Sequence, residues 1–258
     1  MRIALCQLNI EYLRYEKNII RAEHFICEAA RNHADCIVFP EMSFTGYSMD
    51  TAIISRWGKD ACIAMQEIAV KAQIAIGFGW VCSAENRLAE NHYSFIDRTG
   101  KMILDYVKIH PFSYAKENCF YQGGTSLPTA DLCEIPFMNA ICYDLRFPEL
   151  FRILAKEVYA AFVPANWPAK RFSHWKTLLQ ARAIENQMYL IGINCVGDQD
   201  GILYSGGSMV IAPDGTILCD CKNDEGLFFT DISRDAVLTA RESFPALRDM
   251  REELYKKL

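Results

Sequence analysis

The stretch Phe137-Met-Asn-Ala-Ile-Cys-Tyr-Asp-Leu-Arg-Phe-Pro-Glu149 decides the fold and places a reactive group within it. An apolar run typical of a buried strand leads to Cys142, a short polar turn follows, and Pro148 stands where proline favours the first turn of a helix. A strand-to-helix junction of this kind lifts a side chain out of the sheet and leaves backbone N–H groups free beside it. An accessible nucleophile and donors for an oxyanion are two requirements of covalent acyl transfer.

On both sides of this stretch, apolar periodicity predicts strands that alternate with helices. The predicted strands are Arg2–Leu8, Asp35–Phe39, Ile74–Cys82, Tyr93–Asp97, Lys101–Asp105, Phe137–Tyr143, Ala160–Val163, Leu190–Cys195, Gly207–Ile211, Thr216–Asp220 and Gly226–Ile232. The predicted helices are Asn18–Arg31, Ser55–Gln73, Pro148–Lys156 and Ser173–Gln187. This order predicts an α/β fold, a four-layer αββα sandwich of two mixed β-sheets flanked by helices. No linker or repeat divides the sequence, so we expect one domain over residues 1–258.

Composition excludes several classes of function. The net charge of −5 and the lack of a basic run argue against nucleic acid or an anionic membrane as partner. No apolar run approaches the ~20 residues needed to cross a bilayer, and polar residues interrupt the N-terminus too early for a secretion signal. Most of the eleven cysteines lie in apolar segments and none forms a Cys-x-x-Cys pair, so we expect reduced thiols, no metal and no cofactor. The protein is expected to be cytoplasmic.

Three polar side chains occupy comparable places in the predicted sheets. Glu41 follows the strand that ends before Pro40, Lys108 follows a strand that ends at Val107, and Cys142 ends the decisive stretch. Ligand sites in open α/β sheets gather beyond the carboxyl ends of strands, so these side chains could converge. A glutamate can take the proton of a thiol, and a nearby ammonium lowers the thiol pKa and stabilises an oxyanion. Such a set suits amide hydrolysis.

Other polar residues nearby have competing interpretations. A cysteine protease would use histidine as the base, and His110 is the histidine nearest to these groups, which makes it a second candidate. Arg146 could hold the turn before the helix through an ion pair with Glu149. Asp144 and Glu149 could cap the start of that helix.

Six segments in order give the chain a resemblance to the nitrilase superfamily of carbon–nitrogen hydrolases, and the resemblance covers nearly the whole chain. The segments are Ile37–Tyr47, Tyr106–Phe112, Ala140–Glu149, Pro164–Pro168, Ala181–Asn186 and Gly207–Gly215. The resemblance implies an αββα sandwich that pairs into a homodimer or a higher homo-oligomer, partly through C-terminal segments (about residues 233–258).

The same resemblance implies a role for each residue of a Glu-Lys-Cys triad. Glu41 would be the general base and acid, Lys108 would stabilise the oxyanion, and Cys142 would form a thioester that water hydrolyses. Glu117 would orient Lys108 or the substrate. The backbone N–H of Tyr143 would join Lys108 in the oxyanion hole.

Within the superfamily, the segments around Cys142 and Trp167 look most like the branch that includes ω-amidases, which act on small amides such as 2-oxoglutaramate. Arg146, Lys170, Arg171 and His174 follow two strand ends, and a cation there, with Arg171 as a candidate, could bind a substrate carboxylate. Trp167 could line the pocket. The same triad also fits an N-carbamoyl amine hydrolase or a nitrilase, and a non-catalytic binding protein is a further alternative.

Overall fold

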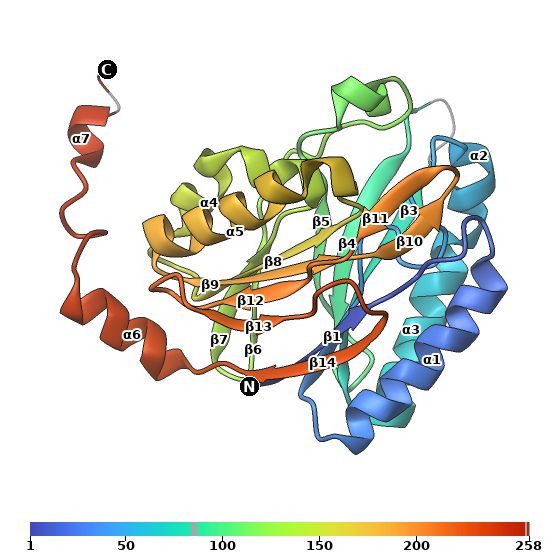
Figure 1. Cartoon of the computed structure of the whole chain (residues 1–258), viewed down its shortest axis with the longest axis horizontal. Coiled ribbons are helices and arrows are strands. Elements are labelled where there is room, and N and C mark those ends of the chain that lie inside the picture. The colour runs from blue at the N-terminus through green and yellow to red at the C-terminus, as the bar shows by residue number, and fades with distance from the viewer. Residues whose placement is uncertain (84–86, 256, 258) are drawn as a thin grey trace.

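The computed structural model describes residues 1–83, 87–255 and 257. The described strands form two six-stranded sheets and one two-stranded sheet (Figure 1). In sheet order, the first sheet holds β14 (Gly226–Asp231), β1 (Arg2–Gln7), β2 (Cys36–Val38), β3 (Ala75–Cys82), β4 (Glu90–Ile96) and β5 (Met102–Val107). The second holds β13 (Ile217–Asp220), β12 (Met209–Ile211), β9 (Tyr189–Asn194), β8 (Ala160–Ala165), β7 (Ile135–Asn139) and β6 (Thr129–Leu132). The small sheet pairs β10 (Val196–Gln199) with β11 (Ile202–Ser205).

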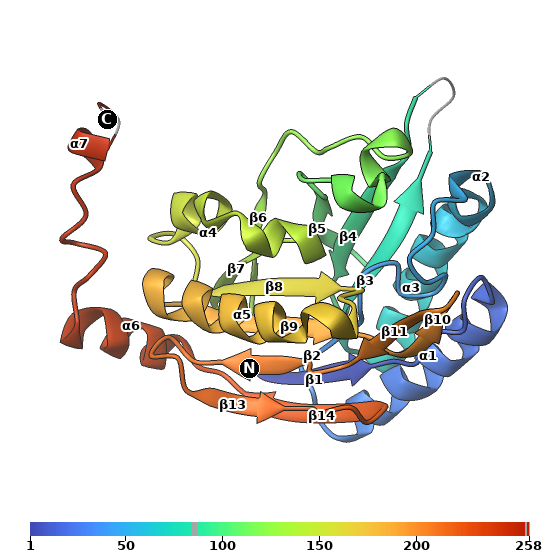
Figure 2. The same cartoon turned by 45° about the horizontal axis from the view of Figure 1, so that its top comes forward.

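Helices cover the outer face of each large sheet, as Figures 1 and 2 show. Beside the first sheet lie α1 (Tyr15–Arg31), α2 (Thr51–Ile54) and α3 (Gly58–Ala72), and beside the second lie α4 (Pro148–Leu154) and α5 (Phe172–Asn186). The tail holds α6 (Arg234–Ser243) and α7 (Glu252–Tyr255). Short 3₁₀ turns are η1 (Ser55–Trp57), η2 (Ser113–Ala115), η3 (Glu117–Cys119), η4 (Cys142–Arg146) and η5 (Ala169–Arg171). The predicted four-layer αββα sandwich is confirmed.

Aromatic rings fill the space between the two sheets. Phe95 on β4 meets Phe137 on β7 and Phe162 on β8, with ring centroids 4.7 and 4.8 Å apart. All three side chains are fully buried. Two further apolar clusters join the outer face of each sheet to its helices. Because each sheet is covered on both faces, its central strands read as continuous apolar runs.

Parallel pairing at the centre of both sheets determines where the site forms. β1, β2 and β3 run parallel to one another, as do β7, β8 and β9. The carboxyl ends of parallel strands share one edge, so the segments that follow β2, β7 and β8 can meet there.

The structure corrects the predicted elements at three places. The strand expected to reach Tyr143 ends at Asn139, because the chain leaves the sheet before Cys142 and turns into η4. β6 and the hairpin of β10 and β11 lie in segments where no strand was predicted. The tail is helical in part as expected, whereas its residues 256 and 258 lie outside the described residues.

Candidate active site

The segment that carries Glu41 is fixed to the neighbouring strand by its backbone. Ser43 donates its backbone N–H to the carbonyl of Gly79 on β3 (3.0 Å), and the Gly79 N–H donates to the Ser43 hydroxyl (2.7 Å). A Cβ atom on Gly79 would lie only 2.4 Å from the backbone nitrogen of Met42. Only glycine allows this approach, so Gly79 holds the Glu41 segment against the sheet.

Lys108 lies between two carboxylates in the interior. Its ammonium donates to Glu41 Oε1 at 2.8 Å and to the two oxygens of Glu117 at 3.1 and 3.0 Å. All three side chains are at most 1% exposed. The Phe112 N–H (2.5 Å) and the Tyr47 hydroxyl (3.2 Å) also donate to Glu117. Two carboxylates and one ammonium leave this cluster with a net negative charge.

Cys142 opens the 3₁₀ turn η4 with a positive φ of 48°. This left-handed conformation is uncommon for a residue with a side chain and is often found at functional sites. The thiol lies 4.0 Å from the backbone carbonyl oxygen of Asn166, and the charges of Glu41 and Lys108 both act on it. None of the hydrogen bonds among the described residues uses the backbone N–H of Tyr143. The structure therefore brings Glu41, Lys108, Cys142 and Glu117 together beside a free N–H donor.

The charges of this cluster act on the thiol in opposite directions. Burial raises the pKa of Cys142 well above its ordinary value, the charges of Glu41 and Glu117 raise it further, and the charge of Lys108 lowers it. Burial alone would lower the pKa of Lys108, but the two carboxylates hold it well above its ordinary value. Lys108 lowers the thiol pKa as expected, but burial and two carboxylates outweigh it, so the pKa of the resting thiol is raised and the thiol is protonated.

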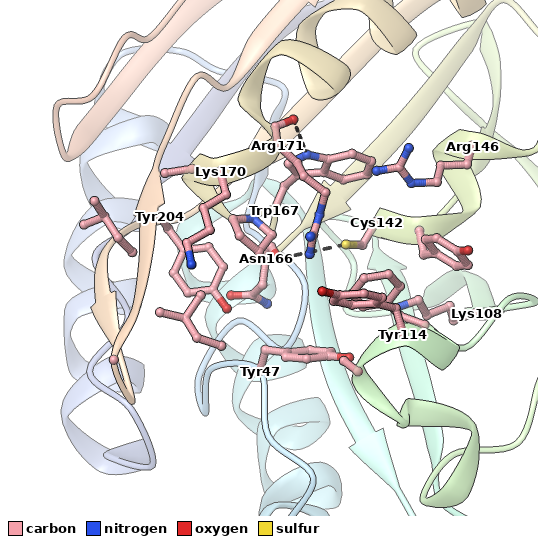
Figure 3. Close-up of a pocket in the computed structure, with 18 residues that line it drawn as sticks. Tyr47, Lys108, Tyr114, Cys142, Arg146, Asn166, Trp167, Lys170, Arg171 and Tyr204 are labelled. Atoms are coloured by element: carbon pink, nitrogen blue, oxygen red, sulfur yellow. Dashed lines mark hydrogen bonds between the residues drawn. The ribbon is translucent and has the colours of Figure 1, made fainter.

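A cavity of about 430 Å³ opens onto Cys142 (Figure 3). Its wall includes all three predicted substrate-contacting residues, Tyr143, Trp167 and Arg171. The Trp167 indole N–H donates to the carbonyl of Arg171 (2.8 Å), which fixes the ring in the wall. Lys170 also lines the cavity. The cavity volume lies in the range of about 300–1,000 Å³ typical of small-molecule sites.

Two polar side chains have other partners than those expected. His110 lies against Phe147 with ring centroids 3.7 Å apart and bonds Asp144 through Nδ1 (2.8 Å), so it does not reach the cavity. Arg146 makes no ion pair with Glu149 within the described chain. Its guanidinium instead lies 4.9 Å from the ring centroid of Trp167 and lines the cavity. The expected turn-holding ion pair was wrong because the aromatic wall holds the guanidinium.

Asp144 caps the 3₁₀ turn η4 that begins at Cys142, whereas no side chain caps the helix that begins at Pro148, so the predicted cap of that helix was wrong. Its carboxylate is fully buried and accepts from the N–H of Ile141 (2.9 Å), the N–H of His110 (2.9 Å) and the Tyr106 hydroxyl (2.7 Å). These contacts tie η4 to the segment that follows β5. Asp144 therefore aligns the segments of Cys142 and Lys108.

Sequence reasoning missed two asparagines that bind Glu41. Asn91 on β4 donates to Glu41 Oε1 (2.8 Å), and Asn166 donates its backbone N–H to Glu41 Oε2 (3.0 Å). The Asn166 amide also donates to the backbone carbonyl of Glu41 (2.7 Å). Asn91 lies in the polar start of β4, Glu90-Asn-His92, so nothing in the local sequence indicated that its side chain is buried.

The described residues contain no group of three or more His, Cys, Asp or Glu side chains that could hold a metal ion. No helix in the described part of the chain is long and apolar enough to cross a membrane.

Comparison with known proteins places this geometry in a family. The family model for carbon-nitrogen hydrolases matches residues 2–242. The chain belongs to the carbon–nitrogen hydrolase family. Its members cleave carbon–nitrogen bonds, so the protein is a hydrolase of this class, and the superfamily resemblance drawn from the six segments is confirmed.

Relatives within the family include amidases. The chain is 34% identical to a 2-oxoglutaramate amidase of Bacillus subtilis, covering 98% of each chain. It is 36% identical to the ω-amidase YafV of Escherichia coli K12, covering 84% of this chain and 85% of that one. Among solved structures, an amidase from Nesterenkonia has a TM-score of 0.89 at 25% identity, covering all of this chain and 95% of the other. The similarity to the ω-amidase branch is also confirmed.

Proposed function

We propose that this protein is an ω-amidase that hydrolyses the terminal amide of short dicarboxylic monoamides, such as 2-oxoglutaramate or 2-oxosuccinamate, and releases ammonia. The observation that carries the proposal is a set of cations in the wall of the Cys142 cavity: Arg146, Lys170 and Arg171. Such a substrate has an amide at one end and a carboxylate at the other. The cavity offers a nucleophile for the first and cations for the second.

The cations have no acidic partner in the described chain. The Arg171 guanidinium lies over the rings of Phe112 and Tyr114, 5.3 and 5.4 Å from their centroids. Burial lowers the pKa of Arg146, and the nearby charge of Arg171 lowers it further, although Tyr143 opposes this. Two arginines that face each other's charge favour an anion between them, because a carboxylate accepts paired guanidinium hydrogen bonds. The names of the two amidase relatives agree with this substrate class.

The first half of the proposed reaction forms an acyl-enzyme. Cys142 attacks the amide carbon as Glu41 takes the thiol proton, and the carbonyl oxygen becomes an oxyanion. Lys108 and the backbone N–H of Tyr143 stabilise that charge, which exists only near the transition state. Glu41 then passes its proton to the amide nitrogen, the carbon–nitrogen bond breaks, and ammonia leaves a thioester on Cys142.

The second half repeats these steps with water. Glu41 takes a proton from water as the oxygen attacks the thioester carbon, and Lys108 and Tyr143 again stabilise the oxyanion. The carbon–sulfur bond breaks, the sulfur recovers a proton from Glu41, and the new carboxylic acid leaves and gives its proton to the released ammonia. Glu117 keeps Lys108 in place through both halves. Glu41 ends as a carboxylate and Cys142 as a thiol, which are the states in which the reaction began, and no step of the proposed reaction uses a cofactor.

The proposal is tested with substrates that differ only in the distal carboxylate. We expect Arg171→Met to lower kcat/KM for succinamate about 10- to 150-fold, the value of one charged hydrogen bond. Its turnover of a neutral amide of similar length should stay within about twofold. Lys176→Met, outside the cavity, is the matched control. Equal loss on both substrates would contradict a carboxylate-binding role for Arg171.

Two further variants and substrates test the chemistry. Cys142→Ala should release no ammonia from 2-oxoglutaramate while keeping its fold; retained turnover would rule out the thioester. Faster ammonia release from a nitrile or a carbamoyl amine than from any monoamide would instead favour a nitrilase or an N-carbamoyl amine hydrolase, which share the triad.

We also propose that residues 1–258 form one domain that pairs with a second copy through the tail from about residue 233. Support comes from Figure 2, where the segment with α7 extends away from the two sheets. We propose a cytoplasmic location because all eleven cysteines are unpaired, as is typical of a reducing compartment. Sedimentation of the protein and of a variant truncated after residue 243 tests the pairing.

A further inference from the structure

The hairpin of β10 and β11 forms one wall of the cavity. Gly201, Ile202, Leu203 and Tyr204 of this hairpin line the cavity, and a bridge between Tyr204 and Pro168 joins it to the segment before η5. The hairpin belongs to neither of the large sheets. A second backbone bridge joins Val196 to Asn9, and the most buried polar side chain of the hairpin is Gln199 at the end of β10, which is 2% exposed.

Gln199 uses both ends of its carboxamide. Oε1 accepts from the backbone N–H of Tyr47 (3.3 Å), and Nε2 donates to Asn166 Oδ1 (3.3 Å) and to Cys195 Sγ (3.2 Å). A Cβ atom on Gly46, which has φ of +75°, would lie 2.6 Å from Oε1. Glycine at this position leaves room for the carboxamide, so the surroundings fit glutamine in one orientation.

Each of two Gln199 partners leads directly to a carboxylate that binds Lys108. Asn166 donates its backbone N–H to Glu41 Oε2 (3.0 Å) and its amide to the Glu41 carbonyl (2.7 Å). Tyr47 donates its hydroxyl to Glu117 Oε2 (3.2 Å). Gln199 itself does not line the cavity. It lies on the hairpin that forms the wall, and a single hydrogen-bonded residue stands between it and each acid: Asn166 for Glu41 and Tyr47 for Glu117.

We propose that Gln199 is a positioning residue that fixes the carboxylates of Glu41 and Glu117 relative to the cavity wall. The proposal rests on the proposed roles of those two carboxylates. Through Asn166 it fixes the oxygen of Glu41 opposite the one that Lys108 binds, and through Tyr47 it fixes Glu117. Loss of Gln199 therefore lowers kcat, because the base is misplaced, and leaves KM nearly unchanged, because the carboxylate-binding cations are untouched.

The experiment compares Gln199→Leu with Gln199→Glu. Leucine removes all three hydrogen bonds and leaves the Tyr47 N–H unpaired, so we expect kcat to fall on the order of 10- to 100-fold, with KM within about twofold. A glutamic acid at this position accepts from Tyr47, and only its protonated form donates to Asn166. The ratio of wild-type kcat to that of Gln199→Glu should thus rise with pH, whereas the ratio for Gln199→Leu stays constant.

The matched control is Gln187→Leu, because Gln187 is also buried and donates to the carbonyls of Ala240 and Phe244, away from the cavity. It should lower the unfolding temperature and leave kcat unchanged. If Gln199→Leu does not fold, the pH dependence of the kcat ratio for Gln199→Glu tests the proposal alone. A kcat equal to wild type in both Gln199 variants, or a ratio for Gln199→Glu that does not change with pH, would overturn the proposal.

A readout without substrate separates this proposal from the proposed function. Iodoacetamide reacts with the thiolate, so its rate with Cys142 depends on the thiol pKa, which the charge of Glu41 raises. We expect this pH profile to shift in Gln199→Leu and to match wild type in Gln187→Leu. An unshifted profile in Gln199→Leu overturns the positioning role. A wild-type protein that cleaves no monoamide defeats the proposed function and leaves the alkylation result standing.

Discussion

Replacing Glu117 with glutamine should separate the ionisation of the nucleophile from the rate of catalysis. Glutamine can keep its oxygen where Oε2 accepts from Phe112 and Tyr47, but its NH₂ group then faces the Lys108 ammonium, which Oε1 had accepted at 3.1 Å. The lost hydrogen bond between charged groups is worth about 1.5–3 kcal/mol. At 1.36 kcal/mol for each tenfold change, kcat should fall about 10- to 150-fold.

The thiol should respond in the opposite direction. The charge of Glu117 raises the pKa of Cys142, so its removal lowers that pKa and increases the fraction of thiolate at a given pH. Alkylation of Cys142 by iodoacetamide should therefore become faster in Glu117→Gln while turnover becomes slower.

Ammonia release from a monoamide and peptide mapping of the alkylated cysteine give the two rates. The control is Glu185→Gln, since Glu185 is partly exposed, pairs with Arg182 at 3.0 Å and lies outside the cavity. Both rates should equal wild type in the control. Slower alkylation in Glu117→Gln, or an unchanged kcat, would show that Glu117 does not act through Lys108 and the thiol.

Two other perturbations have outcomes that follow from the structure. Gly79→Ala places a Cβ 2.4 Å from the Met42 nitrogen and must displace the Glu41 segment, so kcat should fall more than tenfold; wild-type kcat would show that the segment relaxes freely. At Asp105, burial raises the pKa, but hydrogen bonds from His92 and Ser94 and the charge of His92 lower it below its ordinary value. A lowered carboxyl pKa stabilises the fold above the unfolded value of about 4, and that stability is lost as pH falls through the folded pKa. Asp105→Asn should thus unfold at a lower temperature than wild type near neutral pH and match it in acid; a difference that persists in acid would contradict this.

The sequence predicted the layers and the meeting of Glu41, Lys108 and Cys142. Strands are visible in the local pattern of apolar residues, and sites in α/β sheets form beyond the carboxyl ends of the strands. The geometry of Cys142 itself was not predictable in this way. A positive φ at a residue with a side chain has no local signature, so the apolar run was extended through Ile141 to Tyr143 although the sheet ends at Asn139.

The hairpin of β10 and β11 was missed for a different reason. Its centre, residues 197–201, reads Gly-Asp-Gln-Asp-Gly, and a polar stretch with two glycines is typical of a loop. Gln199 within it is buried because its partners Tyr47 and Asn166 are distant in sequence. Long-range hydrogen bonds of this kind leave no periodic pattern in the sequence, whereas the proposed catalytic residues follow predicted strands and can be recognised there.

The charges around the Cys142 thiol act against a permanent thiolate. Arg146, Lys170 and Arg171 give the cavity wall a positive charge, which would stabilise any permanent thiolate and attract other anions to it. Burial and two carboxylates instead keep the pKa of Cys142 high, so its sulfur stays protonated in the empty site. In the proposed mechanism the nucleophile forms only when a carbonyl lies beside it and Glu41 takes the proton. The cations then remain free for the carboxylate of the substrate. The two carboxylates beside Lys108 therefore have two effects: they keep the ammonium charged, and they keep the thiol protonated until a substrate binds.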